Sequence, residues 1–163
     1  MSDTAAATET EAPVFNIQKL YVKDISFENP NAPEVFTVQN AEPNVELNIG
    51  LENKQLDAEH WEVTLKVSVI MRDDKNDKLL FEIEIEHAGL FYIKNIPEEH
   101  MVHLLGVDCP TILFPYTRQI ISQLTVDGGF MSLMLEPVNF AAAFESSRAQ
   151  QAQEQEKAQQ TLN

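Results

Sequence analysis

The stretch Phe81-Glu82-Ile83-Glu84-Ile85-Glu86 alternates strictly between apolar and acidic residues. Successive side chains of a β-strand lie on opposite faces of its sheet, so a period of two predicts a strand with one apolar and one acidic face. The apolar face needs a packing partner. The acidic face cannot be buried against apolar groups, so it faces water or a basic partner. We therefore expect one face of this sheet to be an interaction surface.

The same alternation predicts three more strands, over residues 14–28, 45–51 and 61–71, while the strand containing Phe81 extends over about residues 78–93. A polar turn at residues 72–77 joins the last two as a hairpin, and Gly89 marks an expected bulge or bend. In the first strand the alternation assigns one face to Phe15, Ile17, Tyr21, Ile25 and Phe27, and the opposite face to Asp24, Ser26 and Glu28.

The apolar spacing becomes helical after Pro97. A short helix is expected to end at Gly106, and a longer one to run over residues 110–126, with Pro115 in its first turn. This longer helix is apolar almost all round, which a helix buried on one side does not need. Asn139 is placed to cap a final helix. The sequence thus predicts an α+β fold, a four-stranded antiparallel sheet followed by a long helix and a C-terminal helix.

The length of 163 residues favours one domain with two tails. Residues 1–13 are small, polar and acidic and are expected to be a disordered tail. Residues 14–145 form the domain. Residues 146–163 are rich in Gln, Ala and Glu, and are expected to fray or to be disordered.

The formal net charge of −15 disfavours nucleic acid and anionic membrane surfaces as partners and favours a basic polypeptide. The segment before Ala12 lacks the basic stretch and apolar core of a signal peptide, and no apolar run is long enough to span a membrane. We therefore expect a cytoplasmic protein.

Catalytic signals are weak throughout the sequence. His100 and His103 have the spacing of two metal ligands, but a helix-surface pair is favoured because no cysteine is near and Glu98 and Glu99 are the only local carboxylates. Cys109, the single cysteine, is expected to be a buried thiol. No nucleophile elbow or phosphate-binding loop is present. We expect no enzyme activity, no metal and no cofactor, and the carboxylates of the opening stretch are either solvated or a docking face.

Several large apolar residues fall outside the strand pattern. Core closure, oligomerisation and an adaptable binding groove all account for such residues, and methionine suits the last of these. They are Phe36, Phe114, Phe130, Met131 and Met134.

Three blocks of sequence resemble the SecB family of bacterial protein-export chaperones. The blocks are Lys23-Asp24-Ile25-Ser26-Phe27-Glu28 with Pro30-Asn31-Ala32-Pro33, then Cys109-Pro110 with Ile112-Leu113-Phe114-Pro115-Tyr116, then Pro137-Val138-Asn139-Phe140. The resemblance covers residues 15–144. One departure is that some family members carry a tryptophan near Ala41, whereas the only tryptophan here is Trp61.

The resemblance implies a homotetramer, built as a dimer of dimers, that holds secretory precursors unfolded without ATP hydrolysis and delivers them to the motor protein SecA. The acidic sheet face would receive the basic, zinc-containing C-terminal tail of SecA through Asp24, Glu28 and Glu84. Ile83, Ile85 and His87 would serve tetramer assembly from the opposite face.

The resemblance also implies a client groove with little sequence preference. We expect it to be lined or bordered by Phe27, Phe36, Phe91, Leu113, Phe114, Phe130 and Leu133. Two alternatives stay open at this point: a SecB-like chaperone dedicated to a toxin–antitoxin system, and a small-ligand-binding α+β domain.

Overall fold

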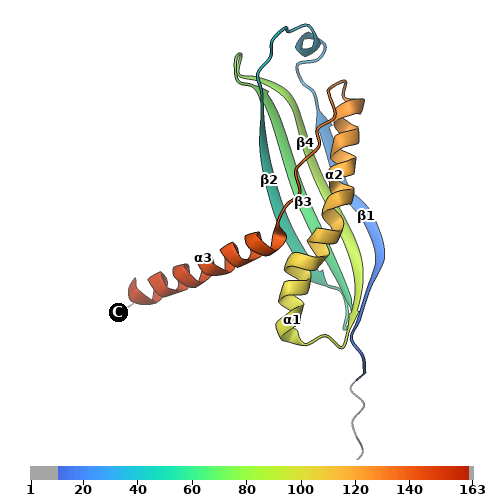
Figure 1. The fold of residues 1–163 in the computed structure, drawn as a ribbon, viewed down its shortest axis with the longest axis vertical. Helices are drawn as coiled ribbons and strands as arrows, with labels where there is room; N and C mark the ends of the chain where they lie inside the picture. Colours follow the sequence, from blue (N-terminus) through green and yellow to red (C-terminus); the bar gives the residue numbers. More distant parts are fainter. Residues whose placement is uncertain (1–10, 162–163) are drawn as a thin grey trace, which may run out of the picture.

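The fold is a sheet with one long helical segment across one of its faces (Figure 1). The computed structural model describes residues 11–161. Its elements are β1 (Val14–Glu28), the 3₁₀ turn η1 (Glu34–Phe36), β2 (Pro43–Gln55), β3 (His60–Asp73), β4 (Lys78–Lys94), α1 (Glu98–His103), η2 (Leu104–Asp108), α2 (Cys109–Asp127) and α3 (Phe140–Thr161).

The sheet has four antiparallel strands in the order β1-β4-β3-β2, which confirms the predicted α+β class and the hairpin between β3 and β4. The chain must therefore cross from one sheet edge to the other after β1. Residues 29–42 make this crossing at one end of the sheet and carry η1 (Figure 1). Both β1 and β2 are edge strands.

β1 contains two bulges. The register against β4 shifts between Ile17 and Lys19 and again between Val22 and Asp24, so Gln18 and Lys23 are extra residues in β1. Each extra residue shifts the alternation of side chains by one position, so the side chains that follow it exchange faces of the sheet. The stretch between the bulges is therefore inverted relative to the predicted alternation, and Tyr21, opposite Ala88, lies on the outer face instead of the apolar one.

Gly89 does not mark a bulge, contrary to the prediction, because it pairs in regular register with Leu20 and Val63. Its role is steric. The ring of Phe91, two residues further along β4, folds back over Gly89, and a Cβ there would lie 2.6 Å from Cε2 of that ring. The missing side chain makes room for a fully buried aromatic residue.

Replacing Gly89 with alanine should lower the free energy of unfolding by about 1–3 kcal/mol, because the added methyl overpacks the site beneath Phe91. Gly50 is the matched control, since a Cβ there would make an ordinary 3.7 Å contact with Cβ of Lys66. Gly50→Ala should change stability by less than about 0.5 kcal/mol. Urea denaturation of both variants at equal protomer concentration makes the comparison, and an equal loss for the two would contradict the steric role.

The helical segment runs without interruption from Glu98 to Asp127, so Gly106 does not end a helix as the sequence predicted. The segment instead widens at η2, where the Cys109 N–H donates to the Leu104 carbonyl five residues back. Pro110 follows directly and has no N–H to donate. Pro115 consequently lies inside the helix rather than in its first turn.

The core lies between α2 and the sheet face beneath it, termed the inner face, whose main residues are Val63, Leu65, Val67, Val69, Phe81, Ile83, Ile85 and Phe91. The sheet face turned away from α2 is termed the outer face. Because α2 lies across β3 and β4, the two edge strands are left partly uncovered on the inner face.

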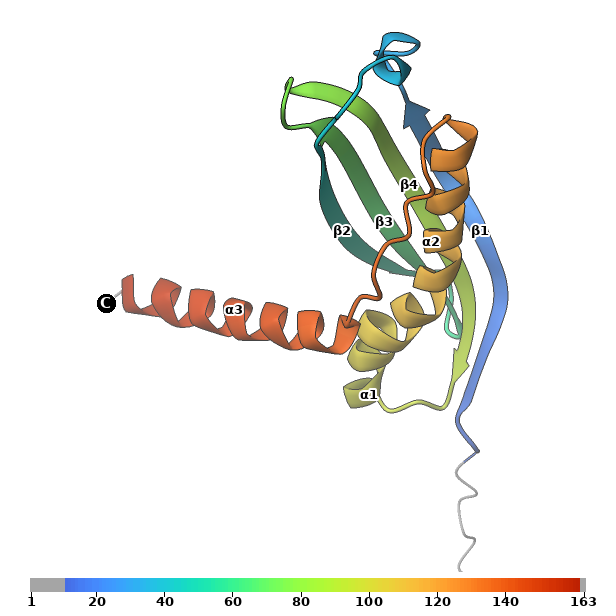
Figure 2. The same ribbon diagram turned by 45° about the horizontal axis from the view of Figure 1, so that its top comes forward.

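Residues 128–139, termed the connecting segment, follow α2 and run alongside it back toward α3, which projects away from the sheet (Figure 2). Asn139 caps α3 as predicted, with its Oδ1 accepting the Ala142 N–H at 3.0 Å. The helix continues to Thr161, through a stretch for which the sequence predicted fraying or disorder. Alanine, glutamine and glutamate all have high helix propensity, which accounts for the difference.

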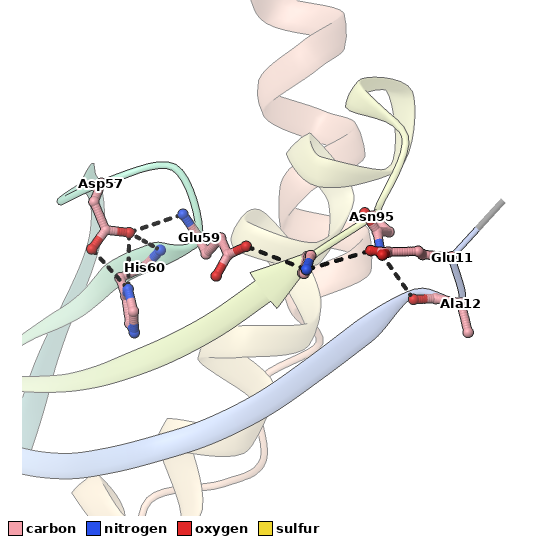
Figure 3. Close-up of polar contacts among 7 residues, drawn as sticks. Glu11, Ala12, Asp57, Glu59, His60 and Asn95 are labelled. Atoms are coloured by element: carbon pink, nitrogen blue, oxygen red, sulfur yellow. Dashed lines mark hydrogen bonds and ion pairs between the residues drawn. The ribbon is translucent and has the colours of Figure 1, made fainter. Parts of the chain in front are cut away.

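The start of β1 is held at the far end of the sheet (Figure 3). Asn95 Nδ2 donates to the Glu11 carboxylate at 3.2 Å and to the Ala12 carbonyl at 3.3 Å. Lys94 Nζ lies 3.4 Å from Glu11 and 3.7 Å from Glu59. Of the predicted tail, residues 1–10 lie outside the described residues.

Candidate binding surfaces

The outer face gathers carboxylates from two adjacent strands. Asp24 of β1 is directly opposite Glu86 of β4, and Glu28 is directly opposite Glu82. Glu84 is opposite Ser26, midway between these two acid pairs. Like charges directly across a sheet are destabilising, so this arrangement favours a solvated face or a cationic partner. The prediction that Asp24, Glu28 and Glu84 share one face is confirmed.

Part of this acidic face is already neutralised within the chain. Lys66 Nζ lies 2.9 Å from Glu52 and 3.4 Å from Glu86. Within residues 11–161, by contrast, no ion pair joins a cation to Asp24, Glu28, Glu82 or Glu84. The carboxylates without an intramolecular cation are therefore concentrated near the end of β1 and the start of β4.

The bulges supply a polar clamp on the same face. Tyr21 and Lys23 of β1 both donate to the Glu62 carboxylate of β3, the Lys23 bond being 2.8 Å long, and so reach across Ala88 of β4. Burial, together with the neighbouring carboxylate, raises the pKa of Tyr21 to about 12. Sequence alternation placed Tyr21 on the wrong face and so missed this clamp.

A depression of about 300 Å³ lies between these charges. Small residues, Gly50 of β2 and Ser68 of β3, lie beside Lys66 and leave room for the depression. Asp24 and Glu84 line its acidic side. The outer face can thus accept a cationic side chain next to the carboxylates that have no cation of their own.

Four aromatic rings form a continuous cluster near the crossing segment. Phe27 stacks on Phe81 at 5.8 Å between ring centroids, Phe81 contacts Phe130 at 4.9 Å, and Phe130 contacts Phe36 at 5.2 Å. Phe81 is fully buried, whereas Phe36 is 50% exposed. The cluster therefore leads from the core to the surface.

The glycines after α2 make room for this cluster. A Cβ on Gly128 would lie 2.1 Å from Cζ of Phe27, and one on Gly129 would lie 3.0 Å from Cζ of Phe36. Gly129 also has a φ of 88°, which favours glycine. The helix ends at Asp127, one residue beyond the predicted end, and the two glycines that follow leave room for two rings.

The seven residues predicted for the client groove separate into two groups. Phe27, Phe36, Phe130 and Leu133 keep exposed surface. Phe91 of β4 and Leu113 and Phe114 of α2 are buried in the core between the helix and the sheet, so they could border such a groove only from beneath. Alternation assigns a residue to a face but does not say whether a helix covers it.

Further apolar surface borders the exposed group. Val45 and Leu47 of β2 lie on the inner face beyond the reach of α2, and both are exposed. Met131 and Met134 of the connecting segment are exposed as well. Together with Phe36 and Val38, these residues make an apolar surface that includes more than the predicted groove residues.

The residues predicted for tetramer assembly lie under α2. Ile83, Ile85 and His87 are buried on the inner face, so in this chain they face their own helix. His87 Nδ1 lies 2.8 Å from Thr117 Oγ1 of α2. Because the single hydroxyl proton of Thr117 goes to the Leu113 carbonyl at 3.1 Å, His87 Nδ1 is the donor in this contact.

The unfolding free energy should fall below pH 6.5, where the unfolded chain begins to protonate His87. Burial lowers the pKa of folded His87 below that ordinary value, so the unfolded state binds more protons in the window between the two pKa values. The slope is at most about 1.4 kcal/mol per pH unit. Denaturant titrations of His87→Gln should lack this slope, and exposed His100→Gln should keep it; an unchanged slope in His87→Gln would refute the assignment.

A second cavity, of about 560 Å³, lies beside α2 toward β1. Leu20, His87, Tyr116, Ile120 and Leu124 line it together with two glutamines. Ile17, Val22 and Ile25 of β1 are also exposed on the inner face, next to this flank of the helix. One apolar side of α2 packs on the sheet and a second side lines this cavity, which accounts for a helix that is apolar almost all round.

The remaining candidate groups offer no reactive centre. Cys109 is fully buried, as predicted, and burial raises the pKa of its thiol to about 12. His103 pairs with Asp108 at 3.4 Å and His100 with Glu99 at 3.5 Å. Over residues 11–161 there is no group of three metal-ligating side chains. Nor does any helix within that range have the length and apolar content needed to cross a membrane.

The chain is thus an α+β sheet domain with an exposed apolar surface on one side of the sheet and an acidic surface on the other. The family model described as "Preprotein translocase subunit SecB" matches residues 8–151, and the chain belongs to this family. A protein-export protein SecB of Desulfotalea psychrophila is 53% identical over 87% of this chain and 91% of its own length. Another, of Magnetococcus marinus, is 47% identical over 95% of this chain and 98% of its own.

A solved structure shares the fold at low sequence identity. It is the SecB-like chaperone of Mycobacterium tuberculosis in complex with a ChAD peptide from the HigA1 antitoxin. The superposition has a TM-score of 0.59 at 16% identity and covers 76% of this chain and 90% of that one. The likeness shows that the architecture described above is a SecB-like fold.

Proposed function

We propose that this chain is an ATP-independent chaperone that holds secretory precursors unfolded and delivers them to the SecA motor. The observation that carries the proposal is the apolar surface beside the aromatic cluster, in a chain that belongs to the SecB family. An unfolded client buries its own apolar side chains there through many weak contacts. Edge strand β2 offers unpaired backbone groups for additional pairing.

The outer face is the proposed docking site for the basic C-terminal tail of SecA. Cationic side chains of that tail would relieve the two acid–acid pairs, Asp24 with Glu86 and Glu28 with Glu82. The client surface and the docking surface then lie on opposite sides of one sheet, so one chain holds a client and meets the motor at the same time.

The proposed assembly is a homotetramer, a dimer of dimers. The apolar flank of α2 and the exposed inner-face residues of β1 are the surface that a second copy would cover. Ile83, Ile85 and His87 would contribute from beneath, by fixing where α2 lies. Native mass spectrometry gives the copy number, and a monomer at micromolar concentration would reject this part.

A folding assay tests the central proposal. Added chain should delay the folding of a purified export precursor without ATP, and the delay should be shorter for Phe36→Ser, which removes an exposed ring of the cluster. The exposed control Glu98→Gln, on α1, should act like the unchanged chain. A precursor that folds at its unassisted rate with the unchanged chain would sink the proposal.

Two other assignments receive less support. A chaperone dedicated to a toxin–antitoxin system shares the fold, but relatives at 40–53% identity are named protein-export proteins. A small-ligand domain needs convergent polar groups in its cavity, and the cavity beside α2 is mainly apolar. The proposed chaperone acts in the cytoplasm, without enzymatic activity or a cofactor.

A further inference from the structure

The connecting segment is held to α2 by three hydroxyl groups. Ser132 Oγ lies 2.5 Å from Ser122 Oγ, and the Leu133 N–H donates to Thr125 Oγ1 at 3.0 Å. The Phe130 N–H donates to the Thr125 carbonyl at 2.9 Å. The backbone on both sides of Met131 is therefore fixed, and the exposure of that side chain is a stable feature of the fold.

The side chains of this segment divide by environment. Phe130 and Leu133 are partly buried against the core, and Leu135 is buried. Met131 is 91% exposed and Met134 is 63% exposed. Two flexible thioethers thus stand in water beside the ring cluster, at the place where the proposed client surface begins.

The other described sulfur atoms are protected. Met71 and Met101 are partly buried against the core, and Cys109 is fully buried with its thiol held protonated. Oxidation by peroxides follows exposure, and for cysteine it also requires the thiolate. An oxidant approaching residues 11–161 from water therefore meets Met131 and Met134 first.

We propose that Met131 and Met134 form a modification site at which peroxides tune client binding. In the reaction a thioether sulfur lone pair attacks one peroxide oxygen, an S–O bond forms and the O–O bond breaks. The thioether is oxidised to a sulfoxide, and hydrogen peroxide is reduced to water. Sulfoxide is polar, so the oxidised side chains pack less favourably on apolar client side chains.

The inference rests on the proposed client binding, and the test keeps the two apart. The full chain is treated with hydrogen peroxide, and oxidised residues are located by peptide mass mapping. Met131 and Met134 should gain one oxygen before Met71 and Met101 do. Equal or faster oxidation of Met71 or Met101 would overturn the site assignment, whether or not a client binds.

Affinity for a purified unfolded export precursor is then measured before and after peroxide. Oxidation should weaken binding by about fivefold to tenfold, while the melting temperature stays unchanged because both side chains already face water. The double variant Met131→Leu/Met134→Leu should bind as well as the untreated chain and become insensitive to peroxide. If the double variant loses affinity with peroxide as the unchanged chain does, the inference fails; if the untreated chain binds no precursor, the proposed function fails.

Discussion

Replacing Phe81 with alanine should lower the free energy of unfolding by about 3–5 kcal/mol. Phe81 is fully buried and is the ring that joins Phe27 to Phe130. Its removal leaves a cavity between β4 and the connecting segment, in addition to the lost transfer free energy. Urea denaturation monitored by circular dichroism gives the value.

Phe36→Ala is the matched control for this variant, because Phe36 belongs to the same cluster but is half exposed. It should lose only about 1 kcal/mol of stability. Both variants must be measured at one protomer concentration, since oligomer stability depends on concentration. A loss of similar size in the two variants would mean that the cluster is not anchored through Phe81.

Reversing the charge of Glu84 should weaken binding of the SecA tail by at least about tenfold at low ionic strength. Glu84 lies between the two acid–acid pairs and lines the depression beside Lys66, so a lysine there would repel the cationic side chains of the proposed partner. Calorimetric titration of a basic tail peptide measures the change, and the difference should shrink as salt is added.

Two variants give this experiment its controls. Glu98→Lys changes the net charge equally but lies on α1, away from the outer face, and should leave affinity close to that of the unchanged chain. Lys66→Met should strengthen binding, because it releases Glu52 and Glu86 from their intramolecular cation. Equal weakening by Glu84→Lys and Glu98→Lys would indicate attraction by net charge alone.

Alternation was sufficient to find four strands and to place Asp24, Glu28 and Glu84 on one face, because a period of two is a direct consequence of strand geometry. The cap at Asn139 and the helix stop at Asp127 were also local features that the sequence determines. These predictions needed no knowledge of which elements pack together.

What the sequence did not predict depends on contacts between distant segments. The burial of Phe91, Leu113 and Phe114 follows from the position of α2 over the sheet. The continuous helix through Gly106 is supported by the Phe144 ring, which lies where a Cβ of that glycine would be. In β1, Lys19 and Lys23 interrupted the apolar pattern and were the available signal for bulges, but only the pairing with β4 locates Gln18 and Lys23 as the extra residues.

The two bulges of β1 determine which changes in the length of this strand preserve the facing of its side chains. One extra residue inverts the strand and the second restores it, so Phe15 and Phe27 both face inward although the stretch between the bulges is inverted. Deleting either Gln18 or Lys23 alone would turn one end of the strand inside out, whereas losing both would keep its two ends in phase. We therefore expect insertions and deletions in this strand to be tolerated in pairs, because a single one exchanges the acidic outer face with the face that packs on the core.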